Sequence, residues 1–195
     1  YSRHPETLRW VKHWDALALR HELLSCEMRL RGYRDATPLF WEEARVVWPA
    51  AYVDAPARQF ELLRSKYSDR EPGRIPLPDD IQQLWRQHKY SVLARNQEGY
   101  RQLGRDVAEG LYDFEALAGV LIEILRRIPA PGGWTNALQH MQGYFKKKGS
   151  RAGRARATTP EENPLMEIHA QAKAHHTGYL LEQTALSDLM VWWRG

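Results

Sequence analysis

The sequence has few of the residues that disulfides, membrane spans or β-sheets require. Its only cysteine, Cys26, excludes an internal disulfide and fits a reducing compartment, or an oxidising one whose conditions the fold does not use. The apolar runs are short, as at 117–125, whereas a membrane span needs about 20 apolar residues. β-Branched residues are scarce, and no stretch alternates apolar and polar residues with a period of two. These absences predict a cytoplasmic protein that neither enters a membrane nor contains a sheet.

The residues that are present favour an all-α fold. Hydrophobic content is 43% and charged content 27% over 195 residues, which is typical of a globular protein. Apolar residues recur at spacings of three and four, and this pattern predicts a multi-helix bundle of about seven to nine helices. We expect one helical segment over residues 1–70 and a second helical domain over 75–195, or one continuous bundle. The first long helix is predicted over 5–31, with Leu8, Trp14 and Leu24 among the residues of its buried face.

Neither a metal site nor a catalytic triad is predicted. The histidines form no His-x-x-x-His pair, there is no second cysteine, and the serines and aspartates show no ordering against the histidines. Cys26 follows two leucines and a serine in a helical stretch, where a core residue is more common than a nucleophile. We therefore expect no cofactor and assign no catalytic residue.

Positive charge is concentrated after residue 145. The net charge is +4, and six cations occupy eleven positions without an acidic residue among them: Lys146, Lys147, Lys148, Arg151, Arg154 and Arg156. Such a run is typical either of a solvated linker or of a contact with a phosphate backbone. The segment 84–96 adds Arg86, Lys89 and Arg95 as candidate nucleic-acid contacts.

Two helical stretches carry side chains suited to a pocket. Asn136, His140 and Tyr144 are four residues apart and share one helix face, where Gly143 allows a backbone or a ligand to approach closely. His88 and Tyr90 come from the earlier stretch. Such residues form either a structural polar network or a ligand site, and both interpretations stay open.

The same stretches carry a family resemblance. Residues 82–96, 100–104, 138–140 and 143–147 resemble the YbgA-like bacterial domain family over about residues 75–150. The resemblance implies an all-α fold and little about mechanism.

Residues 20–33 are similar to the late long helix of pyrimidine-dimer DNA glycosylases of the endonuclease V type, and residues 1–10 look like relatives of that group. This second resemblance, over about residues 1–35, implies a DNA glycosylase/lyase in which an N-terminal amine forms a Schiff base, assisted by a glutamate. Both groups would precede Tyr1, and no residue of this chain matches them.

Three functions are consistent with these features. The leading hypothesis is a nucleic-acid-binding protein associated with DNA repair, whose partner is DNA or RNA. The first alternative is a domain for a modified nucleobase or small molecule, with His88, His140 and Tyr144 around one pocket. The second is a non-catalytic scaffold that docks a partner or a second copy through Trp192 and Trp193.

Overall fold

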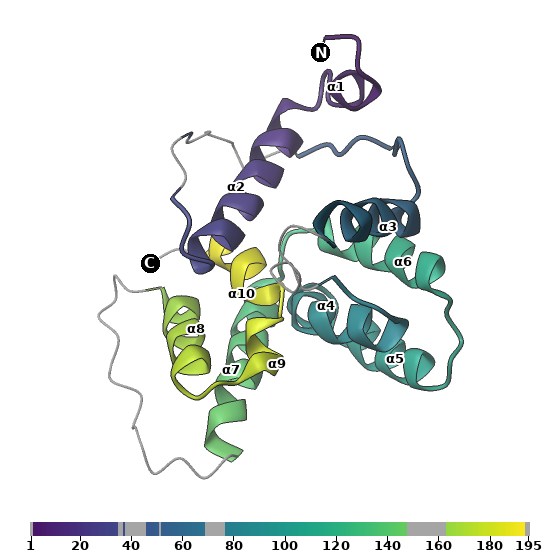
Figure 1. Ribbon diagram of the computed structural model, residues 1–195. Coiled ribbons are helices and arrows are strands. Elements are labelled where there is room, and N and C mark those ends of the chain that lie inside the picture. The colour runs from purple at the N-terminus through teal and green to yellow at the C-terminus, as the bar shows by residue number, and fades with distance from the viewer. Residues whose placement is uncertain are drawn as a thin grey trace. The chain divides into compact units, whose positions relative to one another are not determined.

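The structure is a computed structural model that describes residues 2–34, 37, 46–50, 52–68, 77–147 and 163–193 (Figure 1). These residues form ten α-helices and one 3-10 helix, with no strand among them, which confirms the predicted all-α class. The chain divides into two compact units, residues 1–77 and residues 78–195. The helix number exceeds the expected seven to nine because two helices near the C-terminus have only four residues each.

The first unit contains α1 (Pro5–Arg9), α2 (Trp14–Leu30) and α3 (Pro56–Tyr67). The single helix expected over 5–31 is interrupted, because Lys12 adopts a left-handed conformation with φ of 71°. The buried face of α2 also differs from the prediction: Trp14 and Leu24 are about 60% exposed, while Leu19 and Cys26 are buried. The prediction of a buried face through Leu8, Trp14 and Leu24 is therefore wrong.

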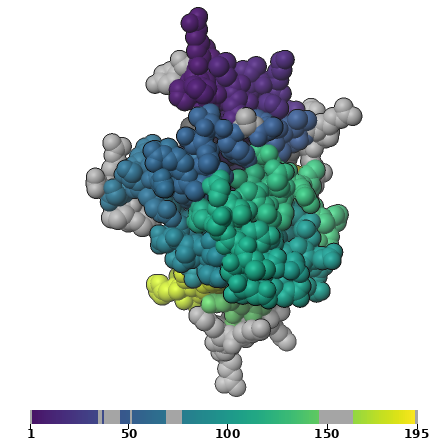
Figure 2. All heavy atoms as spheres, turned by 90° about the vertical axis from the view of Figure 1, so that its right-hand side faces the viewer, coloured from purple at the N-terminus to yellow at the C-terminus, as the bar shows by residue number. Residues whose placement is uncertain are grey.

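The second unit is built around α4 (Ile81–Arg95), which packs against α5 (Gln97–Ala108), α6 (Phe114–Leu125) and α7 (Pro131–Lys147). Leu84, Val92 and Leu93 of α4 are fully buried. Asp80 begins α4 by accepting a 2.8 Å hydrogen bond from the backbone N–H of Gln83. Figure 2 shows the side chains of these helices as closely packed teal and green spheres.

The beginning of α7 fits tightly against the end of α4. The backbone N–H of Ala130 donates a 3.0 Å hydrogen bond to the carbonyl of Ala94. A Cβ atom added at Gly133 would overlap that same carbonyl, so only glycine fits there. This contact orients the α7 side chains that follow.

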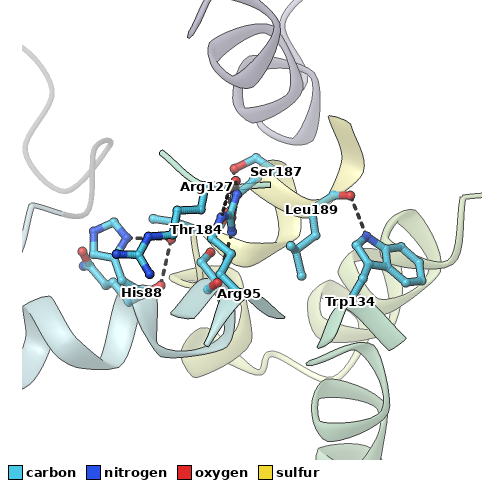
Figure 3. A network of polar contacts seen from close by, with 10 residues as sticks. His88, Arg95, Arg127, Trp134, Thr184, Ser187 and Leu189 are labelled. Carbon is cyan, nitrogen blue, oxygen red and sulfur yellow. Dashed lines mark hydrogen bonds and ion pairs between the residues drawn. The ribbon is translucent and has the colours of Figure 1, made fainter. Parts of the chain in front are cut away.

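The chain ends in α8 (Pro164–Ala174), α9 (Gly178–Leu181), α10 (Ala185–Asp188) and the 3-10 helix η2 (Leu189–Trp192). Polar contacts attach this C-terminal segment to α4 and α7 (Figure 3). The indole Nε1–H of Trp134 donates a 2.9 Å hydrogen bond to the carbonyl of Leu189. Thr184 bonds His88 and Asp188 bonds Arg95, so both ends of α10 are held on α4. Because α9 precedes α10 in the chain, these contacts also place α9 next to α4 and α7.

Across the described ranges, no helix is both long and apolar enough to cross a membrane.

Candidate functional site

An open hollow of about 390 Å³ lies between α4 and α7 of the second unit. Tyr90 of α4 lines it, together with five residues of α7: Asn136, Gln139, His140, Gly143 and Tyr144. Its volume is within the range of about 300–1,000 Å³ that is usual for small-molecule sites. Among the described residues, the lining consists of aromatic rings, side-chain amides and an imidazole, with no carboxylate.

The wall contributed by α7 follows from local helix geometry. Asn136, His140 and Tyr144 succeed one another at intervals of four residues, so they stack along one face. Gln139 directly precedes His140, and Gly143 directly precedes Tyr144; both also line the hollow. Gln139 was not among the predicted pocket residues, although its spacing of three from Asn136 was a usable signal.

Tyrosine rings from distant parts of the chain gather beside the hollow. Tyr144 stacks on Tyr179 of α9, with ring centroids 5.3 Å apart and planes 21° from parallel. Tyr90 lies 6.4 Å from the ring of His140, and its hydroxyl is hydrogen-bonded to that of Tyr179. Burial, followed by this hydrogen bond, raises the pKa of Tyr179 well above its usual value. The Tyr179 hydroxyl therefore stays protonated, and the cluster presents rings and hydroxyl groups.

Lys89 supplies a cation at the edge of this cluster. Its Nζ atom lies 5.0 Å from the ring centroid of Tyr90 and 5.0 Å from that of Tyr179. Contacts of this length with two rings are cation–π interactions. Partial burial, and then the nearby charge of Arg86, lower the pKa of Lys89. Positive charge is thus held against aromatic faces next to a hollow whose described lining residues are all uncharged or imidazole-bearing.

His88 does not join the pocket residues, in contrast to the prediction. Residues two apart on a helix point in directions about 200° apart, so His88 faces away from the hollow that Tyr90 lines. Its Nδ1 atom lies 2.9 Å from the hydroxyl oxygen of Thr184 (Figure 3). Because that hydroxyl donates to the carbonyl of Gln87, His88 carries its proton on Nδ1. Burial lowers the pKa of His88 to about 4, so the ring is neutral at pH 7.

Arg95 is also placed differently from the expectation that it contacts a phosphate. Its side chain is 1% exposed, and both terminal nitrogens donate 2.7 Å hydrogen bonds to the carboxylate of Asp188. Its Nε atom donates to the carbonyl of Arg127 (Figure 3). The guanidinium of Arg95 therefore makes its hydrogen bonds within the protein. Arg86 remains about half exposed and forms a 2.9 Å ion pair with Glu182.

The remaining predicted cations lie at the end of α7 and after it. Lys146 and Lys147 are the last residues of α7, and the structure describes only their backbone. Lys148 and Arg151 lie outside the described residues. In the part of the chain that is described, no group of three or more His, Cys, Asp or Glu side chains is arranged to hold a metal ion.

Two family models match the chain. One, described as "Protein of unknown function (DUF1722)", matches residues 89–188, slightly more than half of the 195 residues. The other, described as "Pyrimidine dimer DNA glycosylase", matches residues 1–40. These matches confirm both resemblances found in the sequence, in the same order. No curated protein and no solved structure shows a significant match to the chain.

Proposed function

The chain belongs to the DUF1722 family, and we propose that its second unit binds nucleic acid, with a base in the hollow of α4 and α7 and phosphates on the adjacent cations. The observation that carries the proposal is the combination of tyrosine rings, amides and Lys89 around one open hollow.

The rings supply the first part of the argument. Stacking of a base on an aromatic side chain is worth about 1–3 kcal/mol per base and does not depend strongly on the base. Tyr90 and Tyr144 both line the hollow, and Tyr144 is itself supported from behind by the stacked ring of Tyr179. A supported ring loses little conformational freedom when a base stacks on it. The amides of Asn136 and Gln139 and the imidazole of His140 can then hydrogen-bond the edge of the base.

Charge supplies the second part. Lys89 lies beside the hollow, and the run from Lys146 to Arg151 directly follows Tyr144 and Phe145 in the sequence. The chain as a whole is basic, with a pI near 9.2. A nucleic-acid-binding site needs both aromatic rings and cations, because rings stack on bases and cations contact phosphates.

The N-terminal match adds support for a link to DNA. Residues 1–40 match a family whose name describes a DNA glycosylase. We propose that the chain binds damaged or modified DNA and that its second unit makes this contact. The match covers none of the residues that line the hollow, so it is independent of the geometric argument.

A salt titration tests the proposal. Binding of a fluorescent oligonucleotide, followed by anisotropy, should weaken as salt rises, with a log–log slope of about −3 to −4 if four phosphates are contacted. A single-stranded oligonucleotide and its duplex should be compared at the same salt concentrations. Absence of binding to either at low salt would refute the proposal. It would leave the two alternatives, a small-molecule domain and a docking scaffold, which ligand screening and light scattering can separate.

A further inference from the structure

Gly143 leaves an opening in the wall of the hollow where any other residue would project a side chain. A Cβ atom added there would meet no atom of the described structure within 4 Å. Gly133, in the same helix, gives the opposite result, because its added Cβ would overlap the carbonyl of Ala94. Within the part of the chain that is described, close packing against another backbone therefore explains Gly133 but not Gly143.

The backbone conformation does not explain Gly143 either. In the described parts of the chain, the glycines with a positive φ are Gly32 and Gly110, both beyond helix ends. Gly143 lies within α7 in ordinary helical conformation, where alanine is more favourable than glycine. Unlike the space in front of the exposed Gly119 of α6, the space in front of Gly143 belongs to the hollow.

We infer that the hollow is a site for one unpaired nucleotide of a single strand, and that Gly143 keeps the place of its base open. This inference rests on the proposed function and specifies its ligand. A base inside a duplex is covered on both faces by its neighbours and must leave the stack before a ring such as Tyr144 can contact it. The side-chain amides of Asn136 and Gln139 lie on the same wall as Gly143, where they face the edge of such a base. Single-stranded DNA and RNA share this chemistry.

Two substitutions at Gly143 and two matched controls test the inference. Gly143→Ala and Gly143→Leu extend a side chain into the hollow by increasing amounts. The same changes at Gly119 are the controls, because Gly119 is an exposed glycine within α6 whose added Cβ also meets nothing within 4 Å. Both pairs replace a helical glycine, so both should raise the melting temperature or leave it unchanged. Loss of binding together with unchanged folding then reports on the hollow.

Binding is measured by anisotropy with single strands of about 12 nucleotides, one DNA and one RNA, and with the DNA duplex. Gly143→Leu should weaken single-strand binding about tenfold or more, which corresponds to the loss of one stacked base. Gly143→Ala should have a smaller effect, and the Gly119 variants should match the wild type. Duplex binding should be weaker than single-strand binding and less sensitive to Gly143→Leu. A larger loss on one of the two single strands identifies DNA or RNA as the preferred ligand.

The outcomes separate this inference from the proposed function. Wild-type binding that Gly143→Leu leaves intact overturns the nucleotide site while nucleic-acid binding stands. An equal loss from Gly119→Leu overturns it as well, because the effect would then not come from the hollow. If the wild type binds no strand at low salt, the proposed function fails and the inference fails with it.

Discussion

The guanidinium of Arg95 holds the carboxylate of Asp188 with two hydrogen bonds of 2.7 Å, and the Arg95 side chain is 1% exposed. This pair joins α4 to α10 across 93 positions of the chain. Because α9 directly precedes α10, the pair also helps to place Tyr179 against Tyr144. A contact remote from the hollow thus contributes to its shape.

Removal of Asp188 should destabilise the second unit strongly. Asp188→Ala leaves the buried guanidinium of Arg95 without its carboxylate partner, with only backbone carbonyls to accept its hydrogen bonds. This loss costs about 3–5 kcal/mol of unfolding free energy. Glu182→Ala is the matched control, since its ion pair with Arg86 is about half exposed and should contribute about 1 kcal/mol or less. Urea denaturation followed by tryptophan fluorescence measures both values. Equal effects of the two variants would contradict the structural role of the Arg95–Asp188 pair.

His88 should make the stability of the protein depend on pH. Its pKa is lowered from 6.5 to about 4 by burial, although the charge of Asp188 opposes the shift. Between these two values the unfolded chain binds a proton that the folded chain does not, so stability falls as pH decreases from 6.5 towards 4. The loss should be about 3 kcal/mol at its limit.

Urea midpoints measured from pH 7 to pH 4 test this expectation. His88→Gln removes the titrating group and should flatten the profile in that window. His176→Gln is the control, because His176 is exposed at the end of α8. A profile of the same steepness in His88→Gln and the wild type would assign the pH dependence to other groups.

Cys26 should be unreactive in the folded protein. The side chain is buried, and burial together with the charge of Glu22 raises the pKa of the thiol to about 12, although Arg29 partly opposes the shift. Since the thiolate is the nucleophile, alkylation by iodoacetamide near pH 8 should be slower than for a free cysteine by about a thousandfold. Mass spectrometry of samples with and without denaturant measures the difference. Rapid labelling of the native protein would show that Cys26 is accessible and ionised.

Lys89 should contribute one phosphate contact. Lys89→Met keeps an apolar side chain against Tyr90 and Tyr179 but removes the charge. The salt slope for a single strand should therefore decrease by about 0.7. Lys66→Met is the control, because Lys66 also lies over a tyrosine ring, 5.6 Å from the centroid of Tyr67, but belongs to the first unit. A slope that changes equally in both variants would argue against a specific contact at Lys89.

The basic run after α7 should account for most of the remaining salt dependence. Changing Lys146, Lys147, Lys148 and Arg151 together to glutamine should abolish retention on a heparin column and reduce the salt slope for DNA by about 3. The control removes four exposed cations elsewhere, Arg58, Lys66, Arg101 and Arg105. Retention of the first variant equal to that of the wild type would show that the run is only a solvated linker.

Local sequence patterns predicted those features that depend on one helix at a time. The intervals of four between Asn136, His140 and Tyr144 place these side chains on one face of any helix, and the hollow is lined by that face. Asparagine is a favoured residue at helix starts, and Asn96 ends α4 and begins α5 by accepting a 2.8 Å hydrogen bond from the backbone N–H of Gly99. The absence of alternating patterns likewise predicted the all-α class correctly.

Tertiary structure alone decided which faces meet. Polar and apolar residues are mixed around α4, and Gln87 and Ser91 are buried beside its leucines, so periodicity did not separate the side that carries Tyr90 from the side on which His88 is hydrogen-bonded to Thr184. Tyr179 joins Tyr144 only because α10 is attached to α4 by contacts such as that of Asp188 with Arg95. Helix periodicity determines which residues share a face, whereas the partner of that face depends on burial and on pairings between segments far apart in the chain.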